Sequence, residues 1–222
     1  MRPAKTTESP RGFDKAVRVW RRFGYYGHMI VFPTASRLAG LILLLGCTVQ
    51  VPAFADEVQV FTDDTSGLLS WKARQPGFSL QFIQLLPDYV RAVYSARGLP
   101  EEVVELMAGY CIFGTIIKNE SDQPLSYRVA DWRYLTGDGQ AHPIKTKTEW
   151  LKQWQDMGVA FRWSLLPDDQ TFAPGDWSQG FTTLPLPPGT PVALHYTWSQ
   201  QGKTYEGTFE DLRCAPAKAP RR

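Results

Sequence analysis

The chain has 222 residues, with 24 basic and 22 acidic side chains and a formal net charge of +2 at pH 7. Eight of the basic residues and two of the acidic ones precede residue 56, so residues 56–222 carry 16 basic and 20 acidic side chains, a net charge of −4. This remainder has no run of lysine or arginine and so lacks the basic patch typical of proteins that bind nucleic acid or anionic lipid.

The first predicted element is a secretory signal peptide at residues 29–55. Arg37 precedes about a dozen mostly apolar residues, and Ala53 and Ala55 form the small-residue pair after which signal peptidases cut. The apolar run is too short to span the ~30 Å hydrocarbon core of a bilayer. We therefore expect an exported protein that starts at Asp56 and has no transmembrane segment, periplasmic where the host has two membranes.

Two features of the N-terminal region leave alternatives open. Signal peptides usually begin close to their charged segment, and residues 1–28 would place a long stretch ahead of it. We therefore expect Met29 to be the true start and 1–28 to be an over-extended reading frame, with Met1 as the alternative. Cys47 follows Leu-Leu-Gly, which is similar to a lipoprotein processing box. A lipoprotein anchored at Cys47 is therefore the alternative to cleavage near Ala55.

The exported part fits a single domain at residues 56–214, long enough to bury a core without a structural metal. Cys111 and Cys214 are its two cysteines, and in an oxidising compartment two cysteines usually pair with each other. We predict that they form a disulfide, with two buried free thiols as the alternative. Residues 215–222, rich in Pro, Ala and basic side chains, are expected to be a disordered tail.

The exported part opens with two predicted strands in residues 56–78, around a turn of Asp, Thr, Ser and Gly. Residues 79–110 are then predicted to form a helical hairpin. Pro87 is expected to open the regular part of the first helix, Gly98 to end it, and Pro100 to open the second helix. Apolar residues of the first helix recur every three or four positions, at Phe82, Leu85, Leu86, Tyr89, Val90, Val93 and Tyr94.

Residues 111–214 change to the alternation typical of strands. The alternation loses its phase at Ala130, which predicts a β-bulge before Trp132. Thr146 and Glu149 form a capping box, which predicts one short helix that ends at Gly158. Predicted strands lie at 112–118, 125–129, 159–165, around 181, at 192–199 and at 205–214; the clearest alternation is in 159–165.

The predicted hairpin at residues 112–127 also resembles a known class of domain. The stretch Lys118-Asn-Glu-Ser-Asp-Gln-Pro124 between two strands, and the later Leu-Pro-Pro-Gly-Thr190 before a strand, resemble the secreted immunoglobulin-like modules of bacteria over residues 112–214. The resemblance implies a binding, assembly or spacer role and names no ligand. With the alternation, it predicts a mainly β fold: an antiparallel immunoglobulin-like sandwich with an N-terminal helical hairpin and one short inserted helix.

Metal binding and catalysis find little support in the pattern. His142 and His195 are the histidines of the exported part, and zinc or copper sites need three or four convergent ligands. A copper site that uses Met107 or Met157 is the alternative, and we expect no cofactor. The serine in Gly175–Gly180 lacks the spacing of a nucleophile elbow, and paired cysteines leave no reactive thiolate. We therefore predict no catalytic residue.

Tryptophan provides the candidate binding surface. Trp150 and Trp154 share one face of the predicted short helix, and Trp177 lies in a polar loop. Exposed tryptophan on a rigid scaffold binds sugars or partner proteins, and the alternative is that these residues cap the core.

The predicted function is therefore that of a non-catalytic exported accessory or binding protein for another envelope protein or assembly. The alternative is a polysaccharide-binding protein or glycoside hydrolase that uses these tryptophans with Asp168, Asp169 or Asp176.

Overall fold

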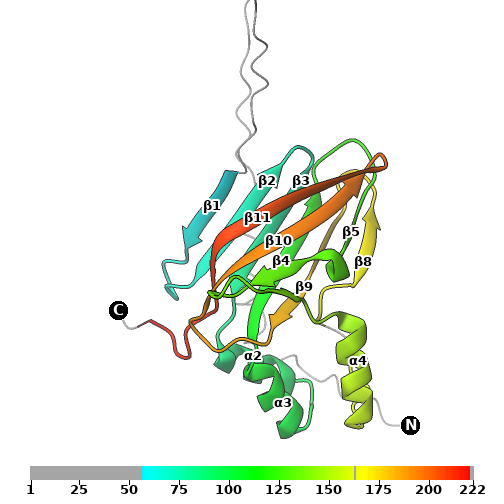
Figure 1. Cartoon of the computed structure of the whole chain (residues 1–222). Coiled ribbons are helices and arrows are strands. Elements are labelled where there is room, and N and C mark those ends of the chain that lie inside the picture. The colour runs from blue at the N-terminus through cyan, green and yellow to red at the C-terminus, as the bar shows by residue number, and fades with distance from the viewer. Residues whose placement is uncertain (1–56, 163, 221–222) are drawn as a thin grey trace, which may run out of the picture. The chain divides into compact units, whose positions relative to one another are not determined.

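The computed structural model describes residues 57–162 and 164–220. The predicted signal peptide at 29–55, the segment 1–28 and the lipoprotein alternative at Cys47 lie outside the described residues. In the described part the chain is mainly β, with two antiparallel sheets and three α-helices (Figure 1). None of these helices is long and apolar enough to cross a membrane.

The first sheet has five strands in the order β1-β2-β3-β4-β9, and every neighbouring pair is antiparallel. The hairpin of β1 and β2 confirms the two strands predicted in residues 56–78. The strands are β1 (Glu57–Thr62), β2 (Leu69–Gln75), β3 (Phe78–Gln84), β4 (Cys111–Asn119) and β9 (Trp177–Leu184).

The second sheet has six strands, with the order β7-β6-β10-β5-β8 and β11 on the other side of β10. The strand predicted at 192–199 is confirmed as β10, the long central strand of this sheet. The strands are β5 (Leu125–Arg128), β6 (Arg133–Leu135), β7 (Ala141–Pro143), β8 (Asp169–Phe172), β10 (Pro191–Gln200) and β11 (Lys203–Arg213).

A 3-10 helix separates β5 from β6, where the sequence predicted a β-bulge. β5 pairs with residues 198–200 of β10, and β6 pairs with residues 193–195 of the same strand. The intervening residues are taken up by the 3-10 helix η1 (Val129–Asp131). The loss of phase at Ala130 therefore marks a whole turn inserted between two short strands, and the predicted bulge is wrong.

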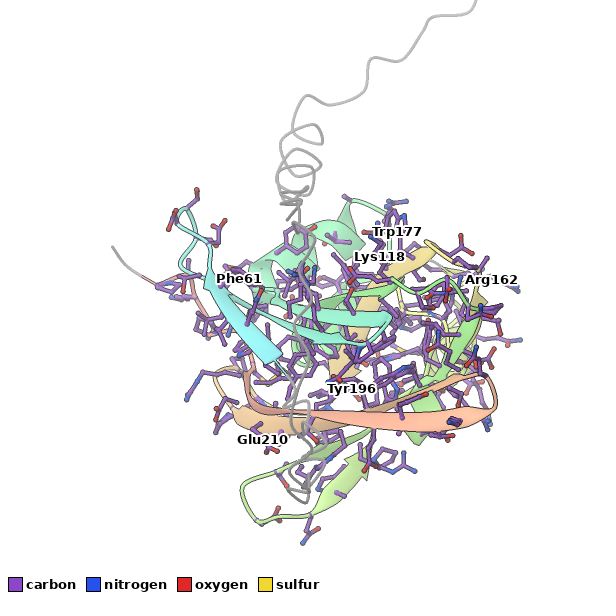
Figure 2. The ribbon with its side chains drawn as sticks, turned by 90° about the horizontal axis from the view of Figure 1, so that it is seen from above. Phe61, Lys118, Arg162, Trp177, Tyr196 and Glu210 are labelled. Carbon is purple, nitrogen blue, oxygen red and sulfur yellow. A yellow bond between two sulfur atoms is a disulfide. The ribbon has the colours of Figure 1, made fainter. Side chains whose placement is uncertain are left out.

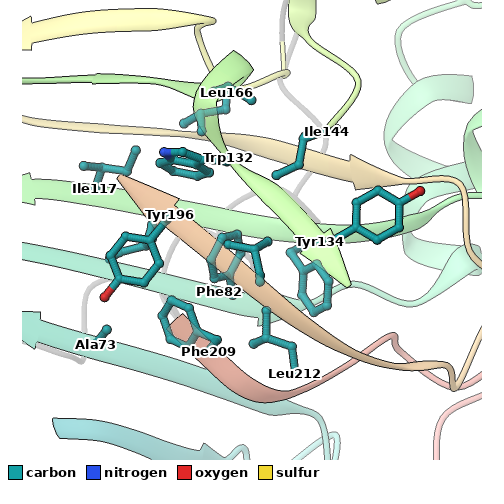
Figure 3. Close-up of a cluster of buried hydrophobic side chains, with 14 of the residues drawn as sticks. Ala73, Phe82, Ile117, Trp132, Tyr134, Ile144, Leu166, Tyr196, Phe209 and Leu212 are labelled. Carbon is teal, nitrogen blue, oxygen red and sulfur yellow. The ribbon is translucent and has the colours of Figure 1, made fainter. Parts of the chain in front are cut away.

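The inner faces of the two sheets share one aromatic core. Phe78 of β3 stacks on Trp198 of β10 with ring centroids 4.6 Å apart, and Phe82 meets Phe209 of β11 edge to face at 5.2 Å. Figure 3 shows Phe82 and Phe209 between strands of both sheets. Each fully buried side chain of this kind contributes roughly 1.5–3 kcal/mol through removal of apolar surface from water, so this core is the main source of stability.

A disulfide joins Cys111, the first residue of β4, to Cys214, just after β11, and confirms the predicted pairing. It links the two sheets at one end. The packed chain continues beyond Cys214, because Ala215 is buried and its carbonyl oxygen accepts a hydrogen bond from the Gly189 N–H at 3.0 Å. The expectation that disorder begins at residue 215 is therefore wrong for Ala215.

Two helices, α2 (Pro87–Ser95) and α3 (Glu101–Ala108), follow β3. α2 begins at Pro87 as the sequence predicted. Residues 79–84 are wrongly predicted as helix, because they form β3 and pair with β2 and β4. Their apolar residues alternate, with Leu80 and Phe82 buried in the core, and the apparent helical spacing arises where this strand runs directly into α2.

The third helix, α4 (Lys147–Asp156), begins at the predicted capping box. The Thr146 side chain accepts a hydrogen bond from the Glu149 N–H, and the Glu149 carboxylate accepts one from the Thr146 N–H at 2.7 Å. A helix N-terminus capped in this way is stabilised by about 1 kcal/mol relative to alanine at the cap.

The three helices lie at one end of the sheets (Figure 1) and enclose a second cluster of buried side chains.

The strand predicted at residues 159–165 is absent from the described residues of this segment. Ser164 has a φ of +75°, a left-handed conformation that interrupts an extended strand, and Leu165 forms only an isolated parallel bridge to Phe181. Val159 and Phe161 pack against the helical cluster instead. Backbone hydrogen bonds join Ser164 and Leu166 to Phe181 of β9, but this contact does not extend into a ladder along the described residues of the segment.

Candidate functional site

Trp150 and Trp154 are buried, which corrects their prediction as a contact surface. Both have 0 % exposed surface and belong to the buried cluster that α4 shares with α2 and α3. The Trp150 Nε1–H donates to Thr183 Oγ1 at 2.8 Å, and Lys145 Nζ lies 3.6 Å from the centroid of the Trp150 ring. The Trp154 ring lies 6.1 Å from that of Tyr94. These two tryptophans hold the helices to the first sheet.

Trp177 differs from the other two predicted residues, because 57 % of its surface is exposed. It is the first residue of β9 rather than part of a loop, and its register partner is Lys118 of β4. Figure 2 labels the two side chains beside each other. Trp177 is therefore an exposed aromatic residue on an edge strand, with a cation as its neighbour across the ladder.

Trp177 belongs to the outer face of the five-stranded sheet, here called the basic face. Alternation along β2 buries Trp71 and Ala73 and turns the side chains between and after them outward. The register aligns Trp177, Lys118, Ser79 and Arg74 in one row and Gln179, Ile116, Gln81, Lys72 and Gln59 in the next. The basic face is defined as Lys72, Arg74, Gln81, Ile116, Lys118, Trp177 and Gln179.

The positive charges of the basic face repel one another. The pKa of Lys72 is lowered, first by partial burial and then by the nearby charges of Arg74 and Lys118, while Glu120 acts in the opposite direction. Glu120 lies at the rim, with its carboxylate 4.0 Å from Lys118 Nζ. The net charge of the face is positive on a domain that is acidic overall.

Sequence reasoning missed the three cations of the basic face. The signal was present, because Lys72 and Arg74 alternate with Trp71 and Ala73, and Lys118 follows the buried Ile117. What the sequence lacked was the strand order, which brings β2 and β4 to either side of β3 and so gathers the cations on one surface.

A second feature is a concavity of about 470 Å³ on the outer face of the six-stranded sheet, here called the polar concavity. It lies over β5, β8 and β10 and reaches β11 and η1. Its lining is mostly hydroxyl, amide and charged groups, among them Ser126, Arg128, Asp131, Asp169, Thr171 and Ser199. Its volume is within the range of small-molecule sites.

The three aspartates proposed for glycoside hydrolysis are in different settings. Asp168 Oδ1 accepts the backbone N–H of Lys147 at 2.5 Å and Oδ2 that of Thr148 at 3.0 Å, so this carboxylate caps the N-terminus of α4. Asp176 Oδ2 accepts the N–H of Ala173 at 2.9 Å within a turn. Asp169 lines the polar concavity. Two of the three carboxylates therefore accept hydrogen bonds from backbone N–H groups and stabilise the local chain conformation.

The histidines and methionines considered for metal binding are dispersed. His142 stacks on Tyr134 with centroids 5.1 Å apart, and His195 Nδ1 is hydrogen-bonded to Thr208 Oγ1 at 2.9 Å. Met107 is fully buried in the helical cluster, and Met157 is partly buried against the same cluster. Over residues 57–162 and 164–220, no three or more His, Cys, Asp and Glu side chains gather closely enough to hold a metal ion.

Comparison with known proteins gives no match. No protein-family model fits the chain, and neither the curated protein sequences nor the solved structures contain a significantly similar one. The two surfaces described above are therefore interpreted from their own chemistry.

Proposed function

We propose that the chain is a non-catalytic exported protein that binds another protein of the cell envelope, and that the basic face is its contact surface. The observation that carries this proposal is Trp177, 57 % exposed and in register with Lys118. Tryptophan and arginine are the residues that most often dominate the binding energy of protein interfaces. Here Arg74 lies in the same row as Trp177, so both types of anchor are present on one rigid sheet.

The partner that fits this surface presents an acidic segment. The pKa of Lys72 is lowered first by its partial burial and then by the positive charges of Arg74 and Lys118. Carboxylates placed between them would relieve that repulsion and form charge-assisted hydrogen bonds. Gln81 and Gln179 offer further donors and acceptors between the charges. Such an interface associates faster at low ionic strength, because charge steers the encounter.

The immunoglobulin-like description of the fold belongs to the same proposal. Two antiparallel sheets with a shared aromatic core support it, and immunoglobulin-like modules serve as binding domains. The three helices are additions to such a module, and they cover one end of the sheets while the basic face keeps its exposed edge at Trp177.

The proposal is tested by capture from the envelope of cells that express the chain. The exported protein, cross-linked and purified, should retain a partner with an acidic segment, and N-terminal sequencing should find its start at Asp56. The partner is then purified, and its affinity is measured at low and high salt. The double variant Lys72→Glu/Lys118→Glu should weaken binding at least tenfold, and Trp177→Ala comparably.

The matched control is Lys203→Glu, a charge reversal at an exposed position of β11 in the other sheet. It should leave the affinity unchanged. A partner that binds the basic-face variants as tightly as the natural protein would contradict the proposal. Turnover of a chromogenic glycoside that Asp169→Asn abolishes would replace it with the glycoside hydrolase alternative.

A further inference from the structure

We propose that the polar concavity is a second binding site, which takes an uncharged, hydroxyl-rich ligand of the carbohydrate class. It lies on the outer face of the six-stranded sheet, whereas the basic face belongs to the five-stranded sheet. The proposal therefore goes beyond the protein-binding function and does not depend on it.

A row of hydroxyl groups crosses the concavity. The register aligns Thr171 of β8 with Ser126 of β5, Ser126 with Ser199 of β10, and Ser199 with Thr204 of β11. Neighbouring strands lie roughly 4.8 Å apart, so the row extends over roughly 14 Å. Each hydroxyl can donate one hydrogen bond and accept two. A ligand that itself carries regularly repeated hydroxyls can match such a row along its length.

The charged groups of the concavity nearly balance. Asp169 pairs with Arg128 in register across β8 and β5, and Arg128 Nε lies 3.4 Å from Asp131 Oδ2. One guanidinium between two carboxylates gives no excess of positive charge for a phosphate or sulfate group. Both kinds of group form strong hydrogen bonds with neutral hydroxyls, the guanidinium as donor and the carboxylates as acceptors. This arrangement selects an uncharged polar ligand.

Hydrogen bonds rather than stacking would supply the affinity. Tyr127 and Trp198 also line the concavity, but both are 3 % exposed because their rings face the core. A sugar therefore has no open aromatic face to lie on at this site. We expect weak binding, with dissociation constants from the high micromolar to the millimolar range.

The test is an NMR titration of the ¹⁵N-labelled exported protein with four neutral probes: maltohexaose, cellohexaose, laminarihexaose and chitohexaose. We expect at least one to cause saturable shifts of the backbone amides of β5, β8 and β10. The variant Ser126→Ala/Ser199→Ala should weaken that binding at least tenfold, whereas Ser70→Ala, which removes a hydroxyl from β2 in the other sheet, should not.

Two outcomes would overturn the inference. One is the absence of saturable shifts with all four probes, and the other is binding that the Ser126→Ala/Ser199→Ala variant retains in full. Preferential binding of dextran sulfate would also contradict it, because the site would then select charge. None of these outcomes bears on the basic face, whose own test uses Lys72, Lys118 and a protein partner.

Discussion

Removal of the Cys111–Cys214 disulfide should be the most damaging covalent change to the fold. The two cysteines are 103 positions apart in the sequence, so the bond closes a loop that includes the whole six-stranded sheet and the strands β4 and β9 of the five-stranded sheet. In the chain-entropy model, a loop of roughly 100 residues restricts the unfolded chain by about 4.7 kcal/mol. Domains of this size are usually stable by only about 5–15 kcal/mol. The variant Cys111→Ala/Cys214→Ala should therefore be close to the limit of stability.

The assay is urea unfolding of the natural protein and the double variant, followed by tryptophan fluorescence. The midpoint should fall by an amount equivalent to about 4–5 kcal/mol. The urea dependence of the unfolding free energy should become steeper, because the unlinked chain exposes more surface. The natural protein in the presence of a reductant is the control and should lose a similar amount. A loss below about 1 kcal/mol would refute the assignment of this stability to loop closure.

Three further predictions concern the core and its surroundings. Trp150→Ala should reduce the free energy of unfolding by about 3–5 kcal/mol, since the side chain is fully buried; lost partner binding with unchanged stability would contradict this. Gly180→Ala should destabilise the fold by roughly 2 kcal/mol or more, because a Cβ there would lie 2.4 Å from the backbone of Leu166. Gly137→Ala, with open space around it, is the control and should change little. Burial raises the pKa of Tyr94 from 10.0 to about 12, so the native state keeps a proton that the unfolded chain loses. Urea unfolding at a series of pH values should therefore show stability falling between pH 10 and 12, by roughly 2 kcal/mol from this group, and Tyr94→Phe should fall less steeply.

The elements that the sequence predicted correctly are those whose signal is local. The alternation of β10 has one apolar face over the whole strand, and the capping box of α4 is formed by two residues of the same turn. The cysteine pair needed only the count of cysteines and the expected compartment. In each case the residues that carry the pattern are also the ones that form the contacts.

The errors arose where the outcome depends on distant partners. Residues 79–84 became a strand because β2 and β4 hydrogen-bond to both of its sides, and the helical spacing came from joining that strand to α2. Residues 159–165 alternate as clearly, but in the described part of the segment their pairing with β9 is limited to an isolated bridge at Leu165. Trp150 packs against Tyr110 and Thr183 of β9, and Trp154 packs against Tyr94 of α2. The sequence of α4 alone does not identify these distant neighbours.

The candidate site was predictable only in part for the same reason. Trp177 was identified from its polar surroundings, and its exposure agrees with that reasoning. Lys72 and Lys118 lie far apart in the sequence. They share a face only because β2 and β4, the strands that carry them, both pair with β3. The hydroxyl row of the polar concavity likewise combines residues of four strands.

Hydrogen–deuterium exchange of the protein, with and without the acidic partner proposed for it, tests the basic face as the contact surface most directly. Protection on binding should be concentrated in β2, β4 and the start of β9 around Trp177, and it should disappear with the Lys72→Glu/Lys118→Glu variant. Protection confined to α4, or to β10 and β11, would contradict it.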